Sequence, residues 1–155
     1  MDRTILWALF IFGIILLIFS LRKPLFKDTI LVFLMKAYFS SFFGVIVAEK
    51  NMIEYPVRFL SKYFETSILY EYFLYPIVCV YFYQTSYRSK FLGIILQDAL
   101  YSAAITAVEV LCEKYTNLIE YRNWTWMYSF ITLFLLSLFV RILMQLINKK
   151  EKLKG

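Results

Sequence analysis

The apolar residues of this chain are gathered into five runs, each close to the roughly 20 residues that a helix needs to cross a bilayer. The runs cover residues 4–21, 29–48, 66–83, 91–111 and 125–147. The third run contains Glu71 and Pro76, and a proline is tolerated there when neighbouring helices satisfy the carbonyl that it frees. We therefore expect one integral membrane domain over residues 1–155, an all-α bundle of five transmembrane helices.

The basic residues of the connections predict the orientation of this bundle. Segments 22–28, 84–90 and 148–155 contain nine Lys and Arg residues in 22 positions, whereas the remaining connections contain six in 33. Basic connections stay on the cytoplasmic side, so the N-terminus is expected outside and the C-terminus inside. The three tryptophans agree, because all lie near the predicted outer boundary, where amphipathic rings are enriched.

The composition favours lipid as the solvent. Hydrophobic residues make up 61% of the chain, whereas soluble domains average roughly 45–50% apolar residues. The net charge of +6 then falls mainly on the cytoplasmic segments, where anionic lipid attracts each basic side chain by about 1 kcal/mol. We expect contact with anionic lipid there, and no nucleic-acid binding, because the short basic tail lacks a folded reading surface.

The residues that most enzymes use are missing. The sequence contains no histidine, no phosphate-binding loop, no nucleophile elbow and no cysteine pair of a zinc or redox site. Acidic residues within the runs are spread over both halves of the bilayer, which does not suit a carboxylate metal site. We expect no catalytic residue, no cofactor, no metal site and no enzymatic activity.

A short amphipathic helix is expected on the outer face, over about residues 56–65. Glu54, Arg58 and Lys62 recur at helical spacing, and apolar residues occupy the opposite side. Pro56 suits the first turn of such a helix, where its missing N–H costs nothing. The helix either covers the bundle or presents a surface to a partner.

Five charged residues lie within the runs, namely Lys36, Glu71, Asp98, Glu109 and Arg141. A charge at mid-membrane costs roughly 2.5–3.5 kcal/mol on insertion scales, so these side chains should face the bundle interior. Lys36, Asp98 and Arg141 lie at similar depth, about 9–10 Å from the inner helix ends. They are expected to pair with Asp98 in the centre, or else the two basic side chains extend to the inner surface.

The fourth run carries a polar stripe. Its members are Asp98, Ser102, Thr106 and Glu109, at steps of four, four and three. Ala103 belongs to a neighbouring edge of small residues, so this helix is expected at the bundle centre. The stripe is either packing through polar contacts or part of an ion path. The full candidate site comprises Asp98, Glu109, Glu71, Lys36, Arg141, Ser102 and Thr106.

Glu71 is isolated from basic residues within the outer half of the membrane. It is therefore expected to pair with Arg58 or Lys62 from the outer connection, to bond with a neighbouring tyrosine, or to take up a proton. A protonatable carboxylate facing a wet cavity is typical of proton-coupled carriers.

Several short motifs resemble small, functionally uncharacterised multi-pass membrane proteins of spore-forming Gram-positive bacteria. These motifs are Trp7-Ala8-Leu9-Phe10, Leu21-Arg22-Lys23-Pro24, Lys36-Ala37-Tyr38, Glu54-Tyr55-Pro56-Val57-Arg58 and Asn123-Trp124-Thr125-Trp126. The resemblance implies a bacterial cytoplasmic membrane and a link to sporulation or the spore membrane. It assigns no activity and no residue roles.

Two functions from different classes are compatible with these features. The first is a non-enzymatic accessory or assembly protein that works through helix and interface contacts with a protein partner or with copies of itself. The alternative is a small oligomeric carrier or channel, coupled to protons or cations, that uses the intramembrane carboxylates.

Overall fold

The computed structural model describes residues 2–154, which are helical apart from connections and one pair of very short strands. The elements are α1 (Asp2–Leu21), α2 (Phe26–Glu49), β1 (Ile53–Glu54), the π-helical segment η1 (Leu69–Leu74), α3 (Tyr75–Ser86), α4 (Phe91–Tyr115), β2 (Glu120–Tyr121) and α5 (Trp126–Lys154). Helices α1, α2, α4 and α5 are long and apolar enough to cross a membrane, which confirms the all-helical membrane character.

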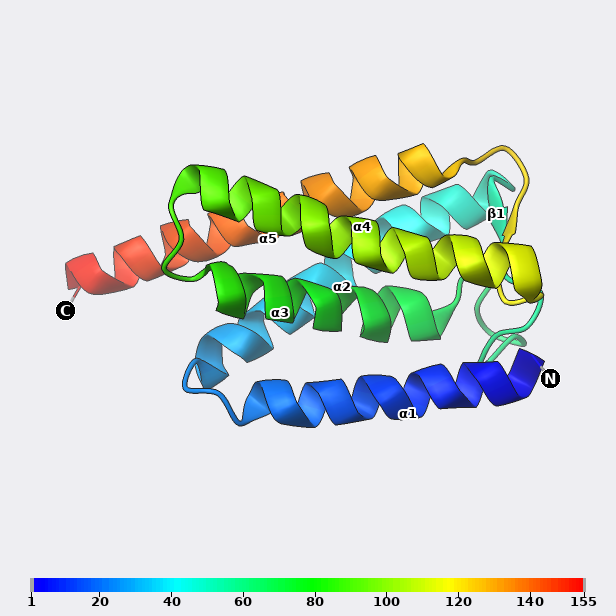
Figure 1. Ribbon diagram of the computed structural model, residues 1–155, viewed down its shortest axis with the longest axis horizontal. Coiled ribbons are helices and arrows are strands. Elements are labelled where there is room, and N and C mark those ends of the chain that lie inside the picture. Colours follow the sequence, from blue (N-terminus) through cyan, green and yellow to red (C-terminus); the bar gives the residue numbers. More distant parts are fainter. Residues whose placement is uncertain (1, 155) are drawn as a thin grey trace.

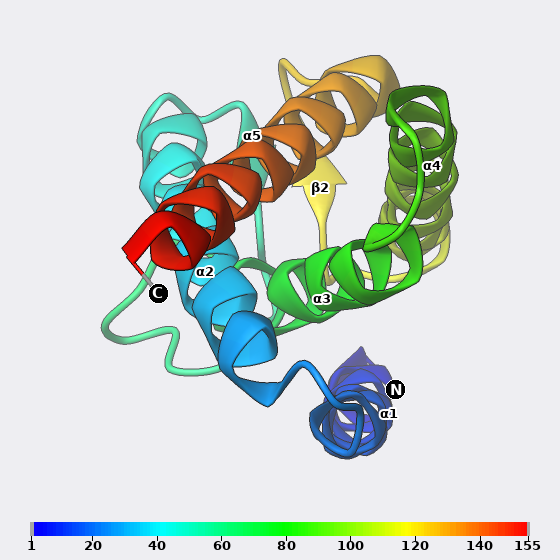
Figure 2. The ribbon, with the colours of Figure 1, turned by 90° about the vertical axis from the view of Figure 1, so that its left-hand side faces the viewer.

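Four of the helical segments form a ring. In order around it, α2, α3, α4 and α5 each pack against the next, and α5 closes the ring against α2 (Figure 2). Helix α1 lies outside the ring against η1 and α3, where the Phe73 ring fills the space beside Gly13. The prediction that the fourth run lies at the centre is wrong, because α4 contributes only one face to the interior and exposes Leu92, Leu96 and Leu100.

The distribution of side chains is inverted relative to that of a water-soluble protein. Large apolar residues cover the outside of every long helix, as Phe12, Leu34, Leu100 and Leu135 illustrate, whereas charged side chains lie inside. Continuous apolar surfaces of this extent are rare on soluble monomers. Lipid chains around the ring satisfy these surfaces without cost.

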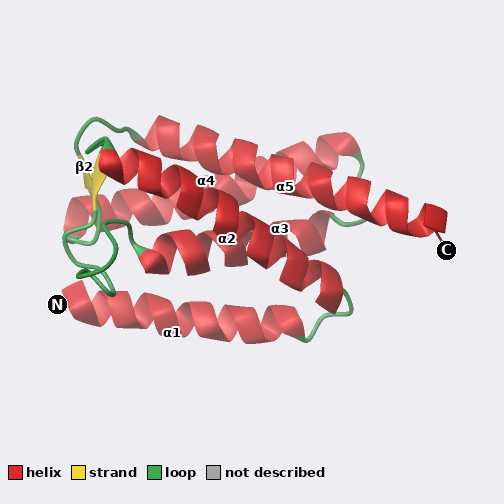
Figure 3. Ribbon diagram, turned by 180° about the vertical axis from the view of Figure 1, so that it is seen from behind, coloured by secondary structure: helices red, strands yellow, loops and turns green. Residues whose placement is uncertain are grey.

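The two ends of the bundle differ. The N-terminal end of α1, the strand pair and the longer connections lie at one end, and the C-terminus and the connections after α1 and α3 lie at the other (Figures 1 and 3). With 29 residues, α5 is about 43 Å long, which exceeds the roughly 30 Å of a hydrocarbon core. Its basic last turns extend beyond the rest of the bundle (Figure 1).

The third segment begins as a π-helix because of Pro76. Proline has no N–H, and its ring crowds the carbonyl four residues earlier. The preceding turn is widened, and the Tyr75 N–H donates to the Tyr70 carbonyl five residues back. Segments η1 and α3 together run from Leu69 to Ser86, so the helix begins and ends three residues later than the predicted run 66–83. Wide turns of this kind are frequent at functional sites.

The predicted amphipathic helix over residues 56–65 is not formed. Residues 55–67 make a series of turns, and Leu60 adopts a left-handed conformation with φ of 53°. The competing interaction is an antiparallel pairing of β1 with β2, after which the Val57 N–H donates to the Asn117 carbonyl. Pro56 favours an extended residue before it, which continues the strand rather than starting a helix.

Arg58 organises the connection that replaces this helix. Its Nε donates to the Phe64 carbonyl at 2.6 Å, and its two terminal nitrogens donate to the carbonyls of Tyr55 (2.7 Å) and Ser61 (3.3 Å). The guanidinium therefore satisfies carbonyls that a helix would have bonded internally.

We expect Arg58→Gln to loosen this connection without unfolding the bundle. Loss of three charge-assisted hydrogen bonds should raise amide hydrogen exchange over residues 55–67 by about tenfold, with little change in the helices. Lys62→Gln is the matched control, because Lys62 is exposed in the same connection. Its ammonium group lies over the Tyr63 ring instead of binding backbone carbonyls as Arg58 does. Equal exchange in the two variants would contradict the role of Arg58.

Candidate functional site

All seven residues of the predicted polar site point inward and are buried. None is more than 5% exposed, although Lys36, Glu71, Asp98, Glu109 and Arg141 are ionisable; the other two are Ser102 and Thr106. The helical periodicity of the stripe on α4 is therefore confirmed, since Asp98, Ser102, Thr106 and Glu109 share the interior face. These residues do not form one cluster but occupy successive levels along the bundle.

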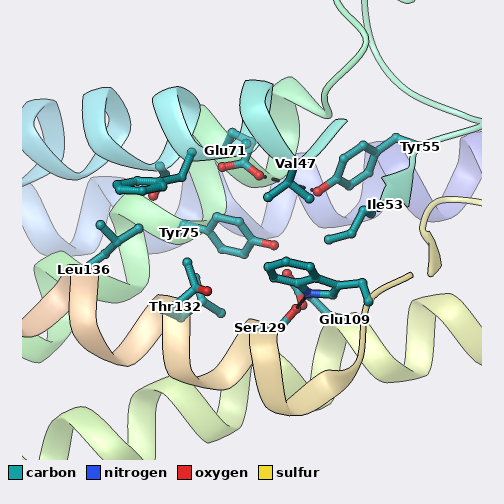
Figure 4. Close-up of a pocket in the computed structure, with 14 residues that line it drawn as sticks. Val47, Ile53, Tyr55, Glu71, Tyr75, Glu109, Ser129, Thr132 and Leu136 are labelled. Atoms are coloured by element: carbon teal, nitrogen blue, oxygen red, sulfur yellow. Dashed lines mark hydrogen bonds between the residues drawn. The ribbon is translucent and has the colours of Figure 1, made fainter. Parts of the chain in front are cut away.

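The level nearest the strand pair contains a small cavity. Its volume is about 40 Å³, and residues of η1 and of all four ring helices line it, together with β1. Glu71 and Glu109 both face this cavity and approach it from opposite sides (Figure 4). A water molecule requires about 10–15 Å³ on this measure, so the cavity has room for more than one water or for a small cation.

Glu71 is held at the cavity by the wide turn of η1 and by the absence of a side chain at Gly44. A Cβ atom at Gly44 would lie 2.6 Å from the Glu71 carboxyl carbon and 2.8 Å from Oε1. The Tyr55 hydroxyl donates to Oε1 over 3.5 Å. The predicted pairing with Arg58 or Lys62 is wrong, because Arg58 binds the carbonyls of its own connection. A tyrosine does donate to Glu71, but it is Tyr55 of that connection and not a tyrosine beside Glu71 in the sequence.

Glu109 also receives its hydrogen bond from outside the long helices. The hydroxyl of Tyr121, in β2, donates to its Oε2 at 3.0 Å. Beside this contact, the Trp124 indole N–H donates to the Ser129 hydroxyl at 2.7 Å, and both residues line the cavity (Figure 4). The strand pair and the start of α5 therefore close the cavity on this side.

Ser40 adds an unsatisfied polar group to the same cavity. Its side chain is only 3% exposed and lines the cavity, yet its hydroxyl oxygen has no hydrogen-bond partner among the described residues. A buried hydroxyl without a partner is costly, so this one favours an occupant such as water or a cation. The Tyr75 ring lies across the cavity and brings a further hydroxyl-bearing side chain to its wall (Figure 4).

A second polar level lies one helical turn further along α2. The Lys36 ammonium donates to the Ser137 hydroxyl at 3.2 Å and, more weakly, to the Leu133 carbonyl at 3.5 Å. On α4, Asp98 Oδ1 accepts from the Ser102 hydroxyl at 3.2 Å. Asp98 Oδ2 and the Thr106 hydroxyl have no partner among the described residues.

The predicted cluster of Lys36, Asp98 and Arg141 does not form, because no ion pair joins them within residues 2–154. Arg141 instead donates to the carbonyls of Ser86 (3.0 Å) and Tyr87 (3.3 Å) and to the Ser86 hydroxyl (3.2 Å). The last carbonyls of a helix lack internal partners and carry partial negative charge. The end of α3 therefore outcompetes Asp98 for this guanidinium.

The interior contains more acidic than basic groups. Glu71, Glu109 and Asp98 are buried with only Lys36 and Arg141 as counter-charges, and neither base is within ion-pair distance of an acid. No group of three or more His, Cys, Asp or Glu side chains in residues 2–154 is arranged to hold a metal ion. A proton or a monovalent cation can balance such an interior.

Several residues of this site escaped the sequence analysis. Ser129, Leu133, Ser137 and Arg141 follow one another at steps of four along one face of α5, so helical periodicity did contain a signal for the two serines. Tyr55 and Trp124 come from connections and Tyr121 from the two-residue strand β2, where no periodicity can be read.

The chain matches no protein-family model, and no curated protein and no solved structure is significantly similar to it. The resemblance in short motifs therefore stays a prediction. The role of each residue rests on its own contacts.

Gly44→Ala should destabilise the protein by about 1–3 kcal/mol, because the added methyl group collides with the Glu71 carboxylate. Thermal unfolding in detergent measures this change. Gly93→Ala is the matched helical control, since its Cβ would lie 3.3 Å from the nearest atom, Ser89 Cβ, and it should be neutral or stabilising by up to about 1 kcal/mol.

A second substitution tests whether the carboxylate itself causes the loss. Glu71→Asp shortens the side chain, so it should recover part of the stability lost in Gly44→Ala, as a double-mutant cycle would show. Simple additivity of the two substitutions would show that Gly44 and Glu71 do not interact.

Proposed function

We propose that this protein is a membrane carrier or channel whose interior takes up and passes protons. The observation that carries this proposal is the placement of two carboxylates, Glu71 and Glu109, on one cavity of about 40 Å³ that also contains the unpartnered Ser40 hydroxyl. Ionisable residues within membrane-embedded bundles are costly and mark ion or proton pathways. Packing alone does not require two acids at the same cavity.

The polar levels extend along the bundle, which supports passage rather than binding alone. From the cavity, the interior continues to Lys36 and Ser137, to Asp98 and Ser102, and then to Arg141 at the far end. Hydroxyl groups accompany the charged groups at each level and can both donate and accept a proton. The unpartnered oxygens of Asp98 and Thr106 leave positions open for such transfer.

The proposal includes five passes through the membrane, with η1 and α3 together as the third, an external N-terminus and a cytoplasmic C-terminus. The alternation of the helices between two ends and the basic connections at the C-terminal end support this topology. In this orientation the cavity of Glu71 and Glu109 lies at the outer end of the proposed proton path. The bacterial cytoplasmic membrane and the link to sporulation stay predictions of the resemblance.

Proton flux in liposomes tests the proposed function. Glu71→Gln and Glu109→Gln should each lower flux by about 100-fold, because an amide cannot exchange a proton with the cavity. Glu65→Gln, in the outer connection, is the charge-matched control and should leave flux unchanged. Ser40→Ala should keep the fold, since it breaks no hydrogen bond within the protein, and should lower flux.

Two results would contradict this proposal. One is wild-type flux no greater than that of empty liposomes under a pH gradient. The other is unchanged proton flux in both glutamine variants when their unfolding temperatures match that of the wild type. If the liposomes show flux of Na⁺ or K⁺ and no proton flux, the transported species at this site is a monovalent cation and not the proton.

The orientation has its own test. A reporter enzyme fused to the C-terminus should be active only when it remains in the cytoplasm, and a tag inserted after Ser61 should be accessible to a membrane-impermeant reagent from outside. A tag inserted after Arg88 is the control for the opposite side. External activity of the C-terminal reporter would overturn the proposed topology.

An accessory or assembly role is the second candidate, and one observation favours it. Ala103 and Ala107 lie exposed on α4 rather than within the ring, beside an apolar groove to which Trp126 and Phe130 of α5 contribute. Small residues on the lipid face of a helix permit close approach of another transmembrane helix.

A further inference from the structure

The cytoplasmic end of the bundle contains a basic groove that the proposed proton path does not use. Its volume is about 340 Å³, and it lies between the end of α3 and the last turns of α5. Its polar lining includes Tyr87, Arg141, Gln145, Asn148, Lys149 and Lys152. Three of these six side chains are positively charged, and no carboxylate lines the groove.

The acidic residues at this end are bound to other groups. Asp28 Oδ2 accepts hydrogen bonds from the Tyr83 hydroxyl (2.6 Å) and the Asn148 amide (3.1 Å). Glu151 pairs with Lys27 at 2.6 Å. The Asp28 carboxylate thus lies beside two neutral residues of the groove lining, and the three basic side chains of the groove outnumber it.

Arg141 forms the floor of this groove and is held in place. Its side chain is 4% exposed, and its Nε and Nη2 atoms are bonded to Ser86 and Tyr87. The guanidinium also lies over the Tyr83 ring, 5.1 Å from its centroid. Nη1 of Arg141 makes no hydrogen bond among the described residues. The guanidinium is therefore fixed in position and still has one nitrogen free to donate to a ligand. A guanidinium suits phosphate because its planar donors match the phosphate oxygens.

The two lysines of the groove, Lys149 and Lys152, lie further out than Arg141, at the height expected for lipid headgroups. Lys149 and Lys152 follow Arg141 by eight and eleven residues on the same face of α5, which places them about 12–17 Å further along the axis. They belong to the part of α5 that extends beyond the bundle (Figure 1). Ile142 and Leu146, on the adjoining face of α5, are 44% and 52% exposed and offer contact to acyl chains.

We propose that this groove binds the phosphate headgroup of an anionic phospholipid from the cytoplasmic leaflet. Basic pockets between transmembrane helices on this side are known to hold such headgroups. The proposal goes beyond a general attraction of the basic tail to the membrane, because it assigns one site with a buried arginine, two lysines and a neighbouring apolar surface. It is independent of proton transfer at the cavity.

Binding of phosphatidylglycerol to the purified full-length protein in detergent tests the site, with native mass spectrometry as the readout. Lys149→Gln/Lys152→Gln should weaken binding by about 30-fold, as expected for removal of two charges near a headgroup. Lys150→Gln/Lys154→Gln is the matched control, because it removes the same charge from the same exposed turns outside the groove. That variant should retain wild-type binding.

Three outcomes would overturn the proposal. Equal losses in the two double variants would show a diffuse electrostatic attraction without a site. Equal retention of phosphatidylcholine and phosphatidylglycerol by the wild type would exclude recognition of an anionic headgroup. Displacement of the lipid by inorganic phosphate at low concentration would identify a soluble phosphate compound, rather than a lipid, as the ligand.

Discussion

The burial of ionisable groups in a bundle surrounded by apolar surface is the constraint on which this structure depends. Each group has to find a partner inside the protein, because lipid offers none. The strand pair serves this need directly. Tyr55 follows β1 and Tyr121 belongs to β2, so one antiparallel pairing brings a hydroxyl to Glu71 and another to Glu109. The opposed Glu54 and Glu120 of the pair would repel each other, and Arg122 bonds both at 3.2 Å.

Features with a fixed period were visible in the sequence. Length and apolarity predicted the helices, and steps of three and four placed Asp98, Ser102, Thr106 and Glu109 on one buried face. The same period applied to Ser129, Ser137 and Arg141 would have identified the facing stripe on α5. Periodicity assigns a side chain to a face of its own helix. It does not identify which residue of another helix lies opposite.

The errors in prediction arose where a distant or local competitor decides the contact. Depth alone suggested that Asp98 binds Arg141, but the free carbonyls at the end of α3 lie nearer and hold the guanidinium. Residues 56–65 have helical charge spacing, but the pairing of Ile53 with Tyr121 keeps the chain that leads into them extended. That pairing joins residues 68 positions apart, and no local sequence pattern in either segment predicts it.

The order of charges along the bundle opposes the passage of positive charge beyond the cavity. A cation that leaves the cavity of Glu71 and Glu109 has to pass Lys36 and then Arg141, both buried and both positive if ionised. Fixed positive charges within a narrow path are effective barriers to cations. Proton transfer between neighbouring groups moves the same positive charge, so Lys36 and Arg141 oppose it as well, and a guanidinium does not release its proton to act as a relay. The hydroxyls of Ser40, Ser137 and Ser102 occur at the levels where such exchange is needed. Under the proposed function, Glu71, Glu109 and Asp98 therefore have to offset the charge of Lys36 and Arg141 along the proton path.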